Sequence, residues 1–276
     1  MLLTGAGNSA WIYSDFGREL ARRHRTFALT RHGHGSSGNP AGGYSIDVMA
    51  EDLRLFLDQR GIARAILIGH SLAGAELTHF AAKYPGRVSA LVYLDAAFDR
   101  STQAKSLEGD PTPSDPPTAA DRASVDSFVA YVRRTRPDLH RYWTGAVEKD
   151  LRASIAMRAD GTAGWVTSAM FGEYWESAAA APPDYAHVTA PALAIYSVED
   201  QQFWLPPDAA PELRARMRAF ERGPSAAWVN ASAAQFRAGP GAREVAEMNA
   251  GHHLFLHRPA ETLALIDAFL KKHRLQ

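Results

Sequence analysis

Short apolar runs alternate with stretches of helical periodicity along most of the chain. The apolar runs are the length of strands and have few polar positions, as expected for parallel strands buried on both faces. They lie at 26–30, 65–68, 88–94, 191–197 and 243–248, after the end of a further strand at 1–4. Helical spacing of apolar residues covers 13–24, 45–60, 71–84, 207–221, 226–238 and 259–272. This alternation predicts an α/β fold with a mostly parallel sheet flanked by helices.

The alternation stops at Asp99. Residues 99–120 are rich in Pro, Ser, Asp and Thr, which is typical of a loop. From 123 to about 180 the chain is helical and aromatic in pattern, with apolar residues between Val125 and Val132 at helical spacing. We therefore predict a core formed by 1–98 and 188–276, and an inserted helical cap at 99–187.

Composition narrows the class of protein. The 276 residues suit one enzyme-sized domain with an insertion. Lys+Arg and Asp+Glu both number 30, and no basic stripe stands out, which argues against nucleic acid or an anionic membrane as partner. There is no cysteine, hence no disulfide and no thiolate chemistry. No apolar run approaches the ~20 residues of a membrane span, and no signal peptide is evident. We expect a soluble, cytoplasmic protein that acts on a small molecule.

The most informative stretch is 66–74, which reads Ile-Leu-Ile-Gly-His-Ser-Leu-Ala-Gly. A serine between a buried strand and a helix is typical of a nucleophile elbow, where a sharp turn exposes Oγ above the sheet. Small residues must flank that serine because strand and helix pass close together, and Gly69 fits. The second glycine of G-x-S-x-G falls on Ala73, with Gly74 one position later. Ser71 is therefore the candidate nucleophile.

A serine hydroxyl is a weak nucleophile and needs a base and an orienting acid. His252 follows the last predicted strand and can take the serine proton. Asp200 follows the strand 191–197 and can hold the imidazole in the required tautomer. Glu199 is adjacent to it, and Asp95 ends the preceding strand, so both stay open as alternatives. The order serine, acid, histidine is that of the α/β hydrolases.

Motifs along the chain strengthen that comparison. They are Thr4-Gly5-Ala6-Gly7, Arg31-His32-Gly33-His34-Gly35-Ser36, Gly69-His70-Ser71, Tyr84-Pro85 with Arg87-Val88, and Gly251-His252. Through them the chain resembles the α/β-hydrolase superfamily over 1–98 and 188–276. The resemblance implies a serine hydrolase without a cofactor, with the backbone N–H groups of Ala6 and Leu72 as the oxyanion hole. Thr4 and Ala73 depart from the family's histidine and glycine.

The resemblance also makes the start of the chain unusual. The first predicted strand corresponds to the family's third, so the hydrolase fold is N-terminally abbreviated. An open sheet edge near 1–4 would leave backbone groups unpaired. We expect either self-association through this edge, as a homodimer, or a longer natural protein with ~20–30 further residues in a hairpin.

The predicted cap sits over the carboxyl ends of the strands, where open α/β sheets bind ligands. Its aromatic residues would wall the site: they are Trp143, Trp165, Phe171, Tyr174 and Trp175. Because the cap carries no cluster of one charge sign, we expect neutral, moderately hydrophobic carboxylic esters as substrates. His32 and His34 suggest a metal site at first, but no third ligand stands near them, and a loop-ordering role fits better.

Other functions remain open. Gly5, Gly7 and Ala10 nominally match a dinucleotide fingerprint, which would indicate an NAD(P)-dependent reductase. Against this, Trp11 is bulky where the helix must approach a pyrophosphate, and Ser71 and His252 would have no role. A ligand-binding protein on a hydrolase scaffold is a further alternative. Within hydrolysis, lactones, amides and C–C bonds compete with esters.

Overall fold

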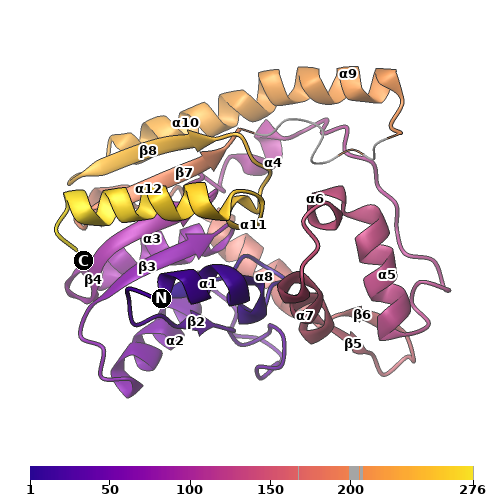
Figure 1. Ribbon diagram of the computed structural model, residues 1–276, viewed down its shortest axis with the longest axis horizontal. Helices are drawn as coiled ribbons and strands as arrows, with labels where there is room; N and C mark the ends of the chain where they lie inside the picture. Colours follow the sequence, from indigo (N-terminus) through magenta and orange to yellow (C-terminus); the bar gives the residue numbers. More distant parts are fainter. Residues whose placement is uncertain (167, 199–204, 206–207, 276) are drawn as a thin grey trace.

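The computed structural model describes residues 1–166, 168–198, 205 and 208–275 (Figure 1). Six strands in this part of the chain form one parallel sheet with the order β2-β1-β3-β4-β7-β8. Their bounds are β1 Leu2–Leu3, β2 Ala28–Leu29, β3 Ala65–His70, β4 Val88–Leu94, β7 Ala192–Ser197 and β8 Arg243–Met248. The parallel sheet predicted from the apolar runs is confirmed.

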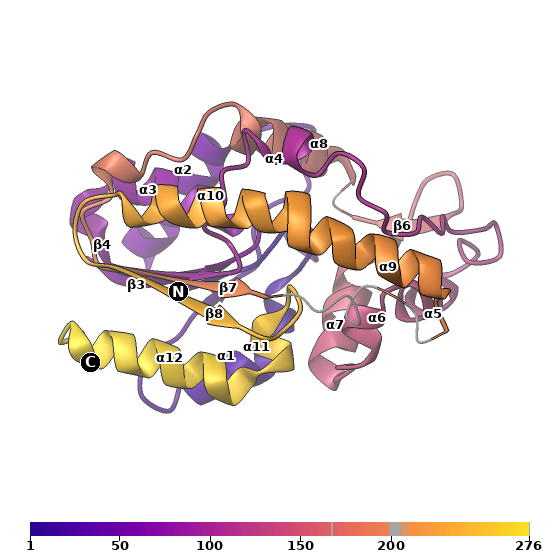
Figure 2. The same ribbon diagram turned by 90° about the horizontal axis from the view of Figure 1, so that it is seen from above.

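Helices cover both faces of this sheet. Figure 2 shows α2, α3 and α10 on one side of the strands and α1 and α12 on the other. The helices of the core are η1 Ala10–Tyr13, α1 Ser14–Leu20, α2 Ile46–Gln59, α3 Ala73–Lys83, η2 Pro85–Arg87, η3 Tyr185–His187, α9 Pro211–Phe220, α10 Ala226–Arg237, α11 Leu254–His257 and α12 Pro259–Lys272. A π-helical turn, Glu221–Ser225, joins α9 to α10. No helix in the described residues is both long and apolar enough to cross a lipid bilayer.

The two faces explain why the strands are apolar nearly throughout. Adjacent side chains of a strand point to opposite faces. Leu2 and Ile68 accordingly pack with α1 and α12, whereas Leu3 and Leu67 pack with α2, α3 and α10. A sheet covered on both sides needs apolar residues at successive positions, which is the pattern that the sequence shows.

The segment between β4 and β7 contains helices and one small hairpin. Its elements are α4 Gln103–Ser106, α5 Val125–Thr135, α6 Pro137–His140, α7 Gly145–Ser154, β5 Ile155–Met157, β6 Ala163–Trp165 and α8 Ser168–Ala179. In Figure 1, α5, α6, α7 and the hairpin lie at one end of the sheet, on the right. Because the segment leaves β4 at its carboxyl end and returns to the start of β7, it can reach over the edge where the candidate catalytic residues lie.

The antiparallel pair β5–β6 corrects the expectation of a purely helical insertion. Its signal is local: Asp160-Gly161 stands between the two strands, and Gly161 has φ +79°, the left-handed conformation that tight hairpin turns require. Asp160 stabilises the turn by accepting hydrogen bonds from the backbone N–H and hydroxyl of Thr162 at 2.9 and 2.7 Å.

Candidate active site

Ser71 lies at a strained turn between β3 and α3. Its φ is +56°, the left-handed region that non-glycine residues rarely adopt. Strain of this kind persists only where the surroundings impose it, and it is common at functional sites. Here the surroundings are the strand β3 that ends at His70 and the helix α3 that begins at Ala73. The elbow predicted from sequence is therefore present in the backbone.

Two glycines make the elbow compact. A Cβ on Gly69 would lie 2.7 Å from a methyl group of Leu77 in α3. A Cβ on Gly74 would lie 1.9 Å from the backbone oxygen of Ala96, which follows β4. The close approach of the helix thus falls on Gly74, one residue after the family's usual glycine. This is why Ala73 is accommodated at the position where the motif departs.

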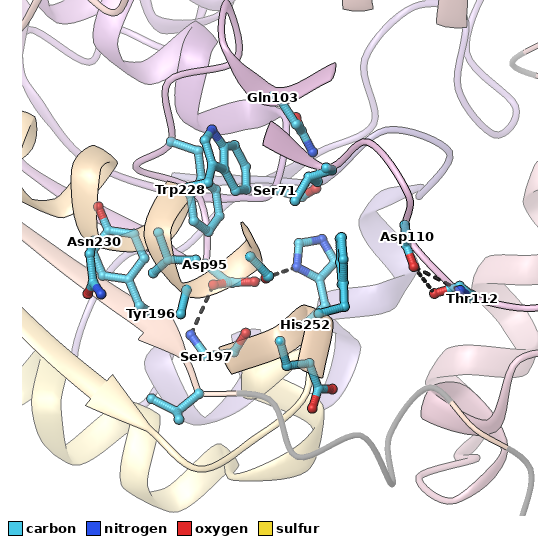
Figure 3. A pocket seen from close by; sticks show the side chains of 18 of the residues that line it. Ser71, Asp95, Gln103, Asp110, Thr112, Tyr196, Ser197, Trp228, Asn230 and His252 are labelled. Carbon is cyan, nitrogen blue, oxygen red and sulfur yellow. Dashed lines mark hydrogen bonds and ion pairs between the residues drawn. The ribbon is translucent and has the colours of Figure 1, made fainter. Parts of the chain in front are cut away.

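His252 is hydrogen-bonded to Asp95 (Figure 3). Its Nδ1 lies 2.6 Å from Oδ2 of Asp95, while Oδ1 of Asp95 accepts the backbone N–H of Ser197 at 2.9 Å. Asp95 follows β4, has φ +48° and is almost fully buried. An ionised carboxylate accepts but cannot donate, so Nδ1 of His252 carries the proton and Nε2 is left to act as a base.

The predicted acid, Asp200, and its neighbour Glu199 lie outside the described residues. The structure instead gives His252 a carboxylate from the preceding strand, the alternative that the sequence left open. Strands β4 and β7 are hydrogen-bonded neighbours in the sheet. Residues that follow them therefore come to the same edge.

His70 joins the elbow to the loop that carries His252. Its Nε2 donates to the backbone oxygen of His252 at 3.0 Å, and the two imidazole rings are 4.5 Å apart. Burial lowers the pKa of His70 well below its ordinary value, and the neighbouring histidines lower it further. A neutral His70 adds no charge beside His252 and fixes the position of its backbone.

The first loop lies against the nucleophile. A Cβ on Gly5 would be 3.0 Å from Cβ of Ser71 and 2.9 Å from Nδ1 of His70, so only glycine fits there. The Gly5 carbonyl accepts from Nη2 of Arg31 at 3.3 Å, and the Thr4 carbonyl accepts from the same nitrogen. In a trans peptide the N–H points opposite to the C=O. The N–H of Ala6 is therefore directed away from Arg31.

Arg31 also connects this loop to two helices. Its Nη1 pairs with Glu76 of α3 and donates to the Tyr174 hydroxyl of α8 at 2.6 Å. Tyr174 in turn donates to Glu76 at 3.1 Å. All three side chains are buried, and burial raises the pKa of Tyr174, so its hydroxyl stays protonated as the donor. One buried ion pair thus links the first loop, the elbow helix and the inserted segment.

Asp150 of α7 holds the other end of the loop. Its carboxylate accepts from the side-chain nitrogen of Asn8 at 2.7 Å, and from the backbone N–H and hydroxyl of Ser9 at 2.6 and 2.8 Å. These contacts place a carboxylate at the start of η1, where a dinucleotide's pyrophosphate would have to sit. The dinucleotide fingerprint at Gly5, Gly7 and Ala10 therefore lies in a loop where the Asp150 carboxylate already fills the position of the pyrophosphate.

Ser71, Asp95 and His252 line one pocket (Figure 3). The aromatic residues that line it are Phe98 after β4, Trp175 of α8, Tyr196 of β7, Phe220 of α9 and Trp228 of α10. Phe98 and Trp228 stack with ring centres 4.5 Å apart. Neither was among the residues that the sequence suggested, because one follows a strand and the other lies in a core helix far along the chain.

The five predicted wall residues have different positions. Of them, Trp175 is the one found among the described residues that line the pocket. Trp143 and Trp165 pack against the apolar core of α5 and α7, and Phe171 is half exposed and stacks on Trp175. Tyr174 points to Arg31 and Glu76. Aromatic side chains on short amphipathic helices bury themselves locally, and sequence spacing does not show which of them face the site.

His32 and His34 order the glycine-rich loop. His32 pairs with Asp52, its Nε2 lies 2.8 Å from the Gly43 oxygen, and its ring stacks on Tyr44. Burial lowers the pKa of His34 to about 3, so it is neutral. The described residues contain no cluster of three or more His, Asp or Glu side chains that could hold a metal ion.

Known relatives share part of this chain. The putative non-heme haloperoxidase of Mycobacterium phage D29 is 38% identical over 98 residues, which is 35% of either chain. The 2-(acetamidomethylene)succinate hydrolase of Mesorhizobium japonicum is 32% identical over 91 residues, or 33% of either chain. The mouse bifunctional epoxide hydrolase 2 is 34% identical over 76 residues, 27% of this chain and 14% of that one. The chain therefore spans about a third or less of the length of these curated relatives.

Solved structures match over nearly the whole chain. An E-2-(acetamidomethylene)succinate hydrolase has a TM-score of 0.68 at 19% identity, covering 98% of this chain and 90% of its own. A putative epoxide hydrolase from Pseudomonas aeruginosa has a TM-score of 0.67 at 21% identity, covering 99% and 88%. At such identities these likenesses establish the fold alone. The model of the alpha/beta hydrolase fold family matches residues 1–259, and the chain belongs to that family.

Proposed function

We propose that this hydrolase-family protein is a serine hydrolase that cleaves carboxylic esters through an acyl-enzyme. The observation that carries the proposal is the 2.6 Å hydrogen bond between Asp95 and His252 in the pocket that also contains the strained Ser71. This is the set of nucleophile, base and orienting acid that acyl transfer needs.

In this mechanism Ser71 Oγ attacks the ester carbonyl while Nε2 of His252 takes the proton. The imidazolium that forms is stabilised by the Asp95 carboxylate on the other side of the ring. The N–H groups of Ala6 and Leu72 stabilise the negative charge on the carbonyl oxygen. His252 then protonates the departing alcohol, and a water activated by the same imidazole releases the acid.

Asp95 serves as the acid in place of Asp200. Two acceptor bonds orient its carboxylate: one atom faces His252 and the other is fixed by the N–H of Ser197. A carboxylate held in this way keeps the imidazole in one tautomer without moving.

A serine nucleophile also restricts the reaction. Two relatives are named for epoxide hydrolysis, but attack of Ser71 on an epoxide would form an ether, which water and a histidine cannot cleave. Attack on a carboxylic ester forms an acyl-serine, which they can. We therefore propose esters ahead of epoxides, and keep lactones and amides as closely related substrates.

The pocket fits a moderately hydrophobic group. Phe98, Trp175 and Trp228 offer aromatic surface near Ser71, and Trp175 keeps the substrate-contact role suggested from sequence. We propose that Trp143, Trp165 and Tyr174 support the fold instead. The same wall carries one cation, Arg100, which the expectation of a neutral substrate did not include.

The test is labelling with a fluorophosphonate, followed by a panel of p-nitrophenyl esters of graded chain length. We expect one label on the protein and none on Ser71→Ala, with a loss of kcat of ~10⁶-fold, as for removal of a triad nucleophile. Ser101→Ala, which removes an exposed serine, is the matched control and should label normally. Labelling that survives in Ser71→Ala would refute the assignment, and labelling without turnover on any ester would favour the binding-protein alternative.

A further inference from the structure

Arg100 is a buried cation in the wall of the candidate active site. It lies five residues after Asp95, lines the same pocket as Ser71 and His252, and has 6% of its surface exposed. Arginine is seldom buried to this degree unless it is paired with an anion. Its guanidinium would therefore be expected to have an anionic partner nearby.

The contacts of Arg100 are neutral. Its Nη1 donates to Oε1 of Gln103 at 2.8 Å. Its guanidinium carbon lies 5.1 Å from the ring centre of Phe98, 5.7 Å from that of Trp175 and 5.8 Å from that of Trp228. Its Nη2 is buried and has no hydrogen-bond acceptor in the described part of the chain. A buried donor left in this state costs free energy comparable to a lost hydrogen bond.

No carboxylate among the described residues forms an ion pair with Arg100. The acidic residues that line the pocket are Asp95, Asp110, Glu221 and Glu247. Asp95 is the one whose charge acts noticeably on Arg100, and its two oxygens are engaged with His252 and the N–H of Ser197. Burial lowers the pKa of Arg100 to about 10, which leaves the side chain positively charged at neutral pH.

The side chains around Arg100 indicate which kind of group its guanidinium can bind. A planar guanidinium with a free N–H matches a carboxylate, and charge-assisted bonds of this kind are strong where water is excluded. The three aromatic rings around Arg100 supply that apolar surrounding. Arg100 is the one Lys or Arg side chain among the described lining residues, so a singly charged carboxylate is better matched than a phosphate dianion.

We propose that Arg100 binds a carboxylate of the substrate, so that the ester cleaved at Ser71 is the half-ester of a dicarboxylic acid or a similar anionic ester. This inference rests on the proposed hydrolase function and replaces the neutral substrate expected from sequence with an anionic one. The ester group lies at Ser71 and His252, and the carboxylate lies at Nη2 of Arg100. Gln103 orients the guanidinium through its bond to Nη1.

The first experiment measures binding without hydrolysis. Ser71→Ala protein is titrated calorimetrically with the monomethyl and the dimethyl esters of succinic, glutaric and adipic acids, which differ in charge but little in shape. At the chain length that spans the two sites, the half-ester should bind about 10- to 100-fold more tightly than the diester, as expected for a hydrogen bond to a charged group. Adding Arg100→Gln should abolish this preference, and adding Arg100→Lys should retain part of it.

The second experiment measures the ratio of kcat/KM for half-ester and diester in the unaltered protein and in Arg100→Gln. A ratio well above one that falls to one or below in Arg100→Gln supports the proposal. Equal binding of half-esters and diesters to Ser71→Ala overturns it, and so does a preference that survives Arg100→Gln. The first of these comparisons needs no change at Arg100, so it can overturn the proposal even if Arg100→Gln fails to fold, and Arg100→Lys then tests the part played by Arg100.

The two experiments also separate this inference from the proposed function. If the unaltered protein hydrolyses none of these esters while Ser71→Ala binds half-esters through Arg100, ester hydrolysis is wrong and the carboxylate site stands. If neutral esters are hydrolysed through Ser71 with no preference for an added carboxylate, the proposed function stands and the role of Arg100 is wrong.

Discussion

The catalytic assignment depends most on Asp95. Asn can replace it with little disturbance, since Asn tolerates positive φ and its side-chain oxygen can still accept the N–H of Ser197. Its NH₂ group cannot accept the proton of His252 Nδ1, so the imidazole loses its orienting anion. We expect Asp95→Asn to keep its fold and lose about four decades in kcat on p-nitrophenyl esters.

The matched substitution at the other candidate acid is Asp200→Asn, for which we expect only a small loss of kcat. Circular dichroism of both variants, recorded with the kinetics, separates lost activity from lost structure. If Asp200→Asn loses its esterase activity while Asp95→Asn keeps it, Asp200 is the acid, as first predicted from sequence.

The sequence marks Ser71 and His252 as candidates, the first by a strand–turn–helix pattern and the second by its place after the last strand. For the acid it favoured Asp200 and kept Asp95 as an alternative. Both come after apolar runs predicted as strands, β4 and β7 are neighbours in the parallel sheet, and sequence does not show where a side chain points. Arg100 was not found either, since a single arginine after a strand has no distinctive pattern and becomes notable only once its burial is known.

Gly74 gives a test of the elbow's packing. The Cβ of Gly74→Ala would overlap the backbone oxygen of Ala96, so helix α3 must move away from β4. We expect the free energy of unfolding to fall by about 3 kcal/mol or more, since backbone atoms cannot relax as a flexible side chain can. The measurement is urea unfolding.

Gly172→Ala is the control, because a Cβ at that exposed position in α8 meets nothing within 4 Å. Alanine is also the better helix former, so this variant should gain up to about 1 kcal/mol. Equal effects of the two substitutions would mean that the elbow is looser than its geometry implies.

At the scale of elements, periodicity predicted the core well and the insertion less well. The strand β4 and the helix α12 have the bounds predicted from sequence, and α2 begins where predicted, with Ser45 as its N-cap accepting from the N–H of Val48. These elements pack in the two large apolar clusters that cover the faces of the sheet, so their apolar patterns are regular. The β5–β6 hairpin has only three residues in each strand, too few for alternation to be distinguished from a helical face, and its Asp160-Gly161 turn was the better signal.

The helix α8 is tied to the elbow helix through one hydroxyl. Tyr174→Phe removes the hydroxyl that accepts from Arg31 and donates to Glu76, leaving both buried charges with one partner fewer. We expect a loss of about 1–3 kcal/mol in the free energy of unfolding. Because Arg31 also binds the Thr4 and Gly5 carbonyls beside the proposed oxyanion hole, we also expect kcat on a p-nitrophenyl ester to fall.

The control for this change is Tyr131→Phe, which removes a hydroxyl that bonds the Asp115 oxygen in an exposed setting. It should leave kcat unaltered and cost little stability, because water replaces an exposed partner. If Tyr174→Phe behaves like this control, the buried network does not position the loop.

At the scale of the whole molecule, buried polar contacts join the inserted segment to the core at both ends of the first loop. Tyr174 binds Arg31 at one, and Asp150 binds Asn8 and Ser9 at the other. Between them lies the stretch Gly5–Gly7 that is expected to hold the oxyanion. Packing of the insertion and the geometry of the candidate active site are therefore coupled. A substitution that weakens one of these contacts should lower both the free energy of unfolding and kcat.

Asp150 makes this coupling dependent on pH. Burial raises its pKa from an ordinary value of 3.8 to about 6, against the opposing effect of its bonds to Asn8 and Ser9. The folded protein thus holds a proton that the unfolded chain has released between these two values. The stabilisation linked to this proton is complete below about pH 4 and is lost as the pH rises through 6, a change on the order of 3 kcal/mol.

Asp150→Asn resembles the protonated acid and cannot titrate. Urea unfolding of both proteins at fixed pH values from 4 to 7 gives the difference in their free energies of unfolding. We expect the unaltered protein to lose about 3 kcal/mol relative to Asp150→Asn across this range, since other titrating groups are common to both. Asp126→Asn, at an exposed carboxylate paired with Arg152, should show little pH-dependent difference. A constant difference for Asp150→Asn would mean that folding does not shift the pKa of Asp150. A difference that grows in favour of the unaltered protein as the pH rises would mean that the fold favours the charged carboxylate.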